Sequence, residues 1–292
     1  MKKKRLYDIL LGICIVAFLV SGGMLMYQIQ EQKKNDSRLE DLSDLVMEQL
    51  EIEDGENGAE SIAGTGKESQ EELLVMPKEE KVHEKRQARV RAYDKIKEQN
   101  SDLVGWIKIE GTKIDYPVLQ SIDRPNFYLN HDFDQKSSIY GAPYVAEECD
   151  LTSDCRNILI YGHHMKNGSM FAALDGYLDE EFWDSHGVIQ FDTLKEYGNY
   201  QVAAVFSMSA VDSSNPLYDW ITAGTEESFT NYVSYIKQHS VYDKGVDIQW
   251  GDHLISLITC EYTHQDGRLI VVAKRIESTI EENGKKQEKK EE

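Results

Sequence analysis

An uncharged run near the N-terminus is the feature that most limits how this chain can fold. The run extends from Ile9 to Tyr27, and the basic stretch Lys2–Arg5 precedes it. A helix needs about 20 apolar residues to cross the hydrocarbon core of a bilayer. Basic residues before such a run and acidic residues after it favour a cytoplasmic N-terminus. We therefore expect residues 1–8 in the cytoplasm, a transmembrane anchor over residues 9–27, and the bulk of the chain outside the cell.

A cleaved signal peptide is the alternative interpretation of this run, because Ser21, Gly22 and Gly23 are small enough for a cleavage site. The apolar residues continue through Met24–Met26, however, and make the run longer than a typical signal-peptide core. That length favours an uncleaved anchor.

The acidic excess of the chain is concentrated in one stretch. The formal net charge is −20 at pH 7, and residues 36–80 contain fifteen Asp or Glu against three Lys or Arg. Residues 28–81 are predicted to be a flexible acidic spacer, because they lack the apolar content to fold alone. Within them, Leu39–Ile52 has apolar residues at helical spacing, which fits either a short amphipathic helix or a frayed tether. Residues 278–292 are predicted to be a charged, disordered tail. The sequence shows no broad basic face, which argues against a nucleic-acid partner.

Short strand-like runs dominate residues 82–277, which are predicted to form one domain. They follow a helix-like segment that ends near Glu98, and turn signals such as Glu110-Gly111 separate them. The eight runs are Val104–Ile109, Lys113–Tyr116, Ile139–Tyr144, Asn157–Tyr161, Val188–Phe191, Tyr200–Met208, Leu254–Thr259 and Leu269–Arg275. Two helical stretches, Met170–Trp183 and Glu226–Gln238, interrupt them. Eight short strands suit a small closed barrel. The expected fold is all-β dominated: a closed eight-stranded β-barrel with an N-terminal helix and helical insertions, preceded by one transmembrane helix.

Two of the predicted strands should bring a cysteine and an arginine together. The apolar run Ser256–Thr259 ends at Cys260, and Arg268 begins the next apolar strand. Such a short connection implies adjacent antiparallel strands, so we expect Cys260 and Arg268 to be neighbours at one rim of the barrel. A third strand, Asn157–Tyr161, ends at Gly162 and is followed by His163 and His164. Glycine permits an unusual backbone path there, and strand ends held by a rigid sheet are natural places for a functional site.

A thiol, an imidazole and a guanidinium together suffice for acyl transfer through a thioester. A free thiol has a pKa of about 8.5, so a neighbouring imidazolium is needed to favour the thiolate and later to protonate a leaving amine. A guanidinium stays charged and can donate to the oxyanion of a tetrahedral intermediate.

Each residue also has a plainer interpretation. A cysteine at a strand end is often only a small apolar side chain, and an arginine that begins a strand is often a solvated charge. The His163-His164 pair could be part of a metal site, but no further Cys or His spacing completes one, so no metal is predicted. His264 is a rival base, because it lies nearer to Cys260 in the sequence.

The other cysteines have separate interpretations. Cys14 lies in the apolar run and is expected to be a packing residue. Cys149 and Cys155 could close a small loop by a disulfide in an extracellular protein, but the sequence alone does not decide this.

The constellation resembles the sortase family. Ser256-Leu257-Ile258-Thr259-Cys260 is similar to the sortase signature Thr-Leu-x-Thr-Cys, with serine in place of the first threonine. Tyr161-Gly162-His163 resembles the step that carries the family's catalytic histidine, and an arginine on the next strand matches Arg268. Asn100–Leu119, Asn126–Phe133 and the inserted helix resemble class B sortases in particular. The resemblance covers roughly residues 85–277.

The resemblance implies a cysteine transpeptidase that needs no cofactor. Cys260 would attack the carbonyl of a threonine in the C-terminal sorting motif of an exported protein, Arg268 would stabilise the oxyanion, and His163 would move the proton. A cell-wall precursor or peptidoglycan amine would then resolve the thioester. Tyr161, Ser256 and Glu261 fall where class B sortases contact the peptide. The stretch before the inserted helix, with Tyr218 and Ile221, is expected to line the groove.

Two other functions remain possible from the sequence. One is a papain-like cell-wall endopeptidase, although its cysteine would normally begin a helix and precede the histidine in the chain. The other is a membrane-tethered β domain that binds peptides without catalysis, in which Cys260 is merely structural.

Overall fold

The computed structural model describes residues 2–60, 89, 92–151, 155–195, 197–209, 225–261 and 267–276; at residues 2–9, 49–60 and 261 it describes the backbone alone. The chain divides into two compact units, residues 1–42 and 43–292, and each is described by itself.

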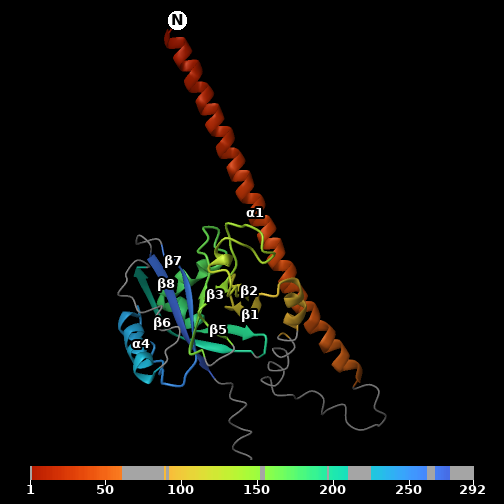
Figure 1. Ribbon diagram of the computed structural model, residues 1–292, viewed down its shortest axis with the longest axis vertical. Coiled ribbons are helices and arrows are strands. Elements are labelled where there is room, and N and C mark those ends of the chain that lie inside the picture. The colour runs from red at the N-terminus through yellow and green to blue at the C-terminus, as the bar shows by residue number, and fades with distance from the viewer. Residues whose placement is uncertain are drawn as a thin grey trace, which may run out of the picture. The chain divides into compact units, whose positions relative to one another are not determined.

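The N-terminal part is one continuous helix, α1, which spans Lys2–Glu60 (Figure 1). By length and composition it is able to span a membrane, because an 18-residue window in it has a mean hydropathy of 2.2. The helix continues beyond residue 27 into the segment predicted to be a flexible spacer. Two features explain this difference: no Gly or Pro occurs between Gly23 and Gly55, and Leu39–Ile52 keeps helical periodicity. Residues 61–81 of the predicted spacer lie outside the described residues.

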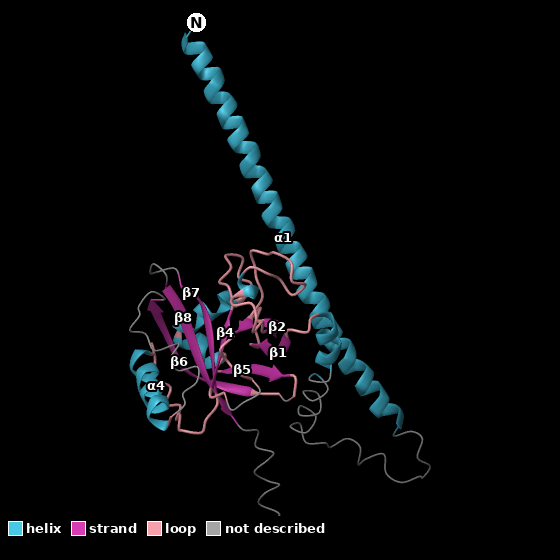
Figure 2. Cartoon of the chain, in the orientation of Figure 1, coloured by secondary structure: helices cyan, strands magenta, loops and turns pink. Residues whose placement is uncertain are grey.

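The second unit contains a closed β-barrel, as predicted. Its strands are β1 (Leu103–Lys108), β2 (Asp115–Leu119), β3 (Tyr144–Val145), β4 (Asn157–Tyr161), β5 (Val188–Thr193), β6 (Asn199–Ser209), β7 (Leu254–Glu261) and β8 (Gly267–Ile276). The strand order around the barrel is β1-β2-β3-β4-β7-β8-β6-β5, and β5 pairs with β1 to close it. Most neighbours are antiparallel, but two pairs are parallel, β2 with β3 and β4 with β7. Figure 2 shows the strands in magenta, with helix α4 beside β6.

One predicted strand is much shorter than expected. Of the run Ile139–Tyr144, only Tyr144 belongs to a strand, the two-residue β3. The preceding residues include Gly141, whose φ is +58°, and Pro143, which has no N–H to donate to a ladder. The positive φ of Gly141 interrupts a regular strand, and Pro143 removes one hydrogen-bond donor.

Helices lie at the three positions that the sequence indicated, and one further short helix, η2 (Phe127–Leu129), was not predicted. The backbone is helical over residues 92–99. The predicted helix over 170–183 is two elements, the 3₁₀ helix η3 (Phe171–Leu178) and α3 (Glu180–Ser185). They divide at Asp179, whose side chain accepts a hydrogen bond from Phe182 N and caps α3.

The inserted helix α4 (Glu226–His239) packs one apolar face on the barrel. A capping box between Thr225 and Ser228 begins it. Its buried residues are Phe229, Tyr232, Val233 and Ile236, the positions that helical spacing predicted.

A buried polar network connects α4 to the parallel strands β4 and β7. Asn157 on β4 donates from Nδ2 to the hydroxyl of Tyr232 on α4 (3.1 Å). Ser256 on β7 donates from Oγ to Asn157 Oδ1 (2.8 Å) and lies 3.1 Å from the Tyr232 hydroxyl. All three side chains are at most 1% exposed. Burial raises the pKa of Tyr232 to about 12, so its hydroxyl stays protonated within this network.

We predict that Tyr232→Phe destabilises the fold by about 1–3 kcal/mol, because it leaves buried polar groups without a hydrogen-bond partner. The matched control is Tyr242→Phe, which removes a hydroxyl that donates to Leu178 O at the surface (3.1 Å) and should cost less than about 0.5 kcal/mol. Urea unfolding of the full-length variants measures both values. Equal losses in the two variants would show that the network does not contribute.

Candidate active site

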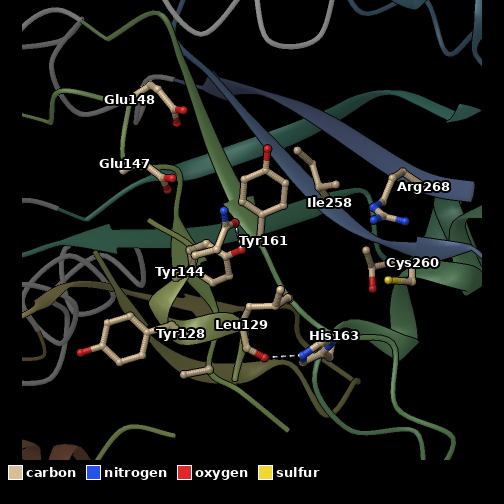
Figure 3. Close-up of a pocket in the computed structure, with 14 residues that line it drawn as sticks. Tyr128, Leu129, Tyr144, Glu147, Glu148, Tyr161, His163, Ile258, Cys260 and Arg268 are labelled. Atoms are coloured by element: carbon tan, nitrogen blue, oxygen red, sulfur yellow. Dashed lines mark hydrogen bonds between the residues drawn. The ribbon is translucent and has the colours of Figure 1, made fainter. Parts of the chain in front are cut away.

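The three residues predicted to carry chemistry meet in one pocket. Figure 3 shows His163, Cys260 and Arg268 at one end of it and Glu147 and Glu148 at the other. The full lining consists of Asn126, Tyr128, Leu129, Ala142, Tyr144, Glu147, Glu148, Tyr161, Gly162, His163, Ile258, Thr259, Cys260 and Arg268.

Strand pairing places the thiol next to the guanidinium. β7 and β8 are antiparallel, and their register sets Cys260 directly opposite Arg268, which confirms the geometric inference from the short connection. Both side chains are half-buried, so they are held by the protein and remain reachable from solvent. Arg268 donates from Nη1 to Gly267 O (3.0 Å), which leaves its other N–H groups for a ligand. Cys260 lies on strand β7. The papain-like alternative would require a cysteine at the start of a helix, so the structure disfavours it.

Gly162 carries the chain from β4 to His163 for a steric reason. Its N–H donates to Ile258 O (3.0 Å) and so extends the β4–β7 ladder by one residue. A Cβ on this glycine would lie 2.5 Å from the Phe171 ring, and Phe171 N in turn donates to His163 O (2.8 Å). We predicted an unusual backbone path at this glycine, but its φ is not positive. Close packing against Phe171 is what requires the missing side chain.

A backbone carbonyl orients the imidazole of His163. The Nε2 atom lies 2.7 Å from Leu129 O. Because a carbonyl oxygen only accepts, Nε2 carries the proton, and in the neutral ring Nδ1 is the nitrogen that can accept one. Gly141 makes room for this arrangement: a Cβ there would lie 2.9 Å from Leu129 O and 3.2 Å from His163 Cδ2.

The neighbouring histidines are placed differently. His164 Nε2 lies 2.6 Å from Asp175 Oδ2, and His164 does not belong to the pocket lining. His264, the rival base, lies outside the described residues. Among the residues that the structure describes, no group of three or more His, Cys, Asp and Glu side chains is arranged to hold a metal ion.

An aromatic pair forms the middle of the pocket. Tyr161, one of the predicted substrate-binding residues, stacks on Tyr144, with ring centroids 5.4 Å apart. The Tyr144 hydroxyl donates to Asn126 Oδ1 (2.9 Å). Ile258 on β7 lies opposite Tyr161 in the parallel ladder and adds an apolar surface.

The structure does not support the prediction that Ser256 contacts the substrate. Ser256 is 0% exposed and hydrogen-bonds Asn157. It precedes Cys260 on the same face of β7, as alternation requires, but Tyr232 of α4 covers that part of the strand. Glu261 ends β7, and only its backbone is described. Tyr218 and Ile221 lie outside the described residues.

Several pocket residues were not predicted as site residues. Tyr128 and Leu129 come from η2, a segment that was singled out only for its resemblance to class B sortases. Glu147 and Glu148 follow β3 after one intervening residue, Ala146. The rule that drew attention to His163, polar residues just after a strand, would have found these two carboxylates as well. They give the pocket a negative end opposite the positive Arg268.

Comparisons with known proteins agree with this geometry. A family model described as the Sortase domain matches residues 107–276. Sortase B of Staphylococcus aureus (strain NCTC 8325 / PS 47) is 31% identical over 186 residues, which cover 63% of this chain and 74% of that protein. Sortase B of Listeria monocytogenes serovar 1/2a is 32% identical over 186 residues, which cover 62% of this chain and 72% of that protein.

Solved structures show the same fold. The X-ray structure of Clostridium perfringens sortase B is 31% identical, with a TM-score of 0.59, and the match covers 63% of this chain and 99% of that one. A Staphylococcus aureus sortase B–substrate complex is 28% identical, with a TM-score of 0.60, and the match covers 68% of this chain and 95% of that one. Since the family model matches more than half of the residues and the closed barrel is shared, this chain belongs to the sortase family of cysteine transpeptidases, with class B sortases as its relatives.

Proposed function

We propose that this membrane-anchored transpeptidase cleaves a C-terminal sorting motif after threonine, through a thioester on Cys260, and transfers the exported protein to a cell-wall amine. The observation that carries the proposal is the meeting of Cys260, His163 and Arg268 at one end of a pocket. Membership of the sortase family supports the coarser activity, the anchoring of surface proteins.

In the first half-reaction, the thiolate of Cys260 attacks the threonine carbonyl. The carbonyl oxygen becomes negative as the tetrahedral intermediate forms, and the guanidinium of Arg268, across the β7–β8 pair, donates to it. His163 is protonated on both nitrogens at this stage. Its Nε2–H stays on Leu129 O, and its Nδ1–H protonates the departing amine, which leaves a thioester on Cys260.

In the second half-reaction, a cell-wall amine attacks the thioester. The neutral imidazole accepts the proton of this amine at Nδ1 while Nε2 keeps its hydrogen bond to Leu129. One ring orientation therefore serves both steps, first as acid and then as base. The new amide forms as the Cys260 thiolate is released.

The sorting peptide would lie against the aromatic pair Tyr161 and Tyr144, which connects the reacting end of the pocket to its acidic end. Glu261, Tyr218 and Ile221 remain proposed contacts from the resemblance to class B sortases. They flank the pocket lining in sequence: Glu261 follows Cys260, and the other two precede α4.

We further propose that α1 anchors the enzyme with its N-terminus in the cytoplasm and its barrel outside. The apolar side chains of this helix, such as Phe18 and Leu19, are exposed, and the basic stretch Lys2–Arg5 precedes them. An anchor would keep the enzyme in the same layer as an exported substrate and a lipid-linked amine, which raises their effective concentration.

Loss of the nucleophile tests the proposed function. Full-length protein incubated with a panel of sorting-motif peptides should gain a covalent adduct that maps to Cys260, and Cys260→Ala should bind the same peptide without any adduct. Intact-mass spectrometry and peptide mapping measure the adduct, and fluorescence anisotropy measures binding. The control Cys155→Ser should keep the adduct, because Cys155 does not line the pocket. An adduct on another cysteine would contradict the assignment.

The two adjacent histidines should differ in their effect on the rate. His163→Ala should lower kcat by about 10²–10⁴-fold through loss of proton transfer. His164→Ala should lower kcat less than tenfold, because His164 is directed to Asp175. Peptide cleavage rates, with melting temperatures as a check on folding, separate the two. The reverse order of effects would move the catalytic role to His164.

The role of the His163 orientation can be tested without substituting His163 itself. Gly141→Ala and Gly168→Ala both force alanine into positive φ, +58° and +77°, at a cost of about 1–2 kcal/mol each. Only the first also displaces Leu129 O and the His163 ring, since a Cβ at Gly168 meets nothing nearer than Lys113 Nζ at 3.8 Å. A Cβ at Gly141 would also lie 2.5 Å from Tyr128 O, so Gly141→Ala should melt at a lower temperature than Gly168→Ala. At a temperature where both variants are folded, we expect a much lower kcat for Gly141→Ala alone. A comparable fall in kcat in both variants would mean that backbone strain, not the imidazole, is responsible.

Arg268→Lys should lower kcat by about 10²–10³-fold, the usual cost of losing an oxyanion donor, because an ammonium cannot reproduce the planar fork of a guanidinium. The matched control is Arg275→Lys on the same strand, outside the pocket lining, which should leave kcat within a factor of two or so of the parent. A near-normal rate for Arg268→Lys would make Arg268 a bystander.

A further inference from the structure

Two cysteines outside the pocket lie beside each other where β3 leads into β4. Cys149 is 1% exposed, and Cys155 is half-buried. Both sulfurs approach the same acceptor: Cys149 Sγ lies 3.8 Å and Cys155 Sγ 3.4 Å from Asn157 O. Both cysteines are free thiols in the structure. The fold thus already holds the pair together, as formation of a bond between them requires.

The backbone around Cys149 is firmly held. The side chain of Gln120 donates from Nε2 to Ala146 O (2.9 Å) and to Cys149 O (2.7 Å). Leu159 N donates to Cys149 Sγ (3.4 Å), which places this sulfur against β4. A bond from Cys149 to Cys155 would therefore attach the start of β4 to an anchored point. The residues just before that point, Glu147 and Glu148, form the acidic end of the pocket.

We infer that Cys149 and Cys155 form a disulfide bond in the protein outside the cell, and that this bond stabilises the β3–β4 connection that carries the acidic end of the pocket. The inference goes beyond the proposed transpeptidase function and needs only the proposed extracellular location, where disulfides persist.

The environments of the two sulfurs define the order of the chemistry. The hydrogen bond with Cys155, together with burial, raises the pKa of the Cys149 thiol. Cys155 is also the more exposed of the two, so an external disulfide reaches its sulfur first. Cys155 attacks this disulfide, which gives a mixed disulfide and releases one thiol. Cys149 then gives up its proton and attacks the Cys155 sulfur, which forms the intramolecular bond and releases the second thiol. The external disulfide is reduced to two thiols, and the two protons go to them.

The pairing also has a consequence for Cys260. An extracellular enzyme with a thiol nucleophile is exposed to the same oxidants. Cys149 and Cys155 resolve any mixed disulfide with each other, because they are already in contact. Neither lines the pocket, so the pairing leaves Cys260 out of any intramolecular disulfide.

Peptide mapping tests the bond directly. Trypsin cleaves after Lys136 and Arg156, and no Lys or Arg lies between them, so both cysteines fall in one peptide, residues 137–156. Full-length protein in membranes is equilibrated with oxidised glutathione or with dithiothreitol, blocked with iodoacetamide under denaturing conditions, and digested. After oxidation the peptide should carry no alkyl group and should be two hydrogen atoms lighter than its dithiol form. After reduction it should carry two alkyl groups. Two alkyl groups, or a glutathione adduct on Cys155, after oxidation would overturn the inference.

Thermal unfolding tests the stabilising role. The oxidised protein should melt about 5–10 °C above the reduced protein, as expected for a disulfide that closes a short loop in a domain of this size. The matched variant Cys155→Ser keeps a hydroxyl near Asn157 O and should show the lower melting temperature under both conditions. If the oxidised parent and Cys155→Ser melt together, the bond does not stabilise the connection. Neither readout depends on the enzyme's own cleavage of a sorting peptide, so failure here and failure of the proposed function are distinguishable.

Discussion

The hydrogen-bond register of β4, β7 and β8 is the constraint on which the site depends. In the parallel pair, Tyr161 lies opposite Ile258, and in the antiparallel pair Cys260 lies opposite Arg268. Side chains alternate along a strand, so a slip of one residue in the β7–β8 pairing would turn Cys260 to the opposite face. Closure of the barrel opposes such a slip, because β8 also pairs with β6, and the ladder continues through β5 to β1. The thiol and the guanidinium are therefore positioned by the fold as a whole.

The third functional group is held by packing and not by a ladder. His163 leaves the sheet after Gly162, where Phe171 fills the space that a side chain would need. A hydrogen bond to Leu129 O then orients its ring, and the missing side chain of Gly141 leaves room for this contact. The contacts in this arrangement are made by backbone groups and a buried ring, so the fold orients the imidazole before any peptide arrives. Such preorganisation is what allows one side chain to act as acid and then as base without a change of position.

Local patterns in the sequence were enough to predict the parts of the structure that depend on neighbouring residues. Short strand-like runs and turn signals predicted the eight-stranded barrel, and a short connection predicted that Cys260 and Arg268 are neighbours. Contacts between distant segments were beyond such patterns. The Leu129–His163 hydrogen bond joins residues 34 positions apart, and the burial of Ser256 depends on α4 packing over β7. The roles of Cys260, His163 and Arg268 in the reaction come from their chemistry and family resemblance, and remain proposals.

The central claim is that these three side chains act on one scissile amide. Its most direct test is a crystal structure of the protein with a threonine-containing peptide analogue attached to the Cys260 sulfur. The account predicts that the oxygen of the reacting carbonyl accepts a hydrogen bond from Arg268, and that the leaving-group side faces Nδ1 of His163 while Nε2 remains on Leu129 O. A carbonyl oxygen turned away from the guanidinium, with His163 out of reach of the leaving group, would contradict the account.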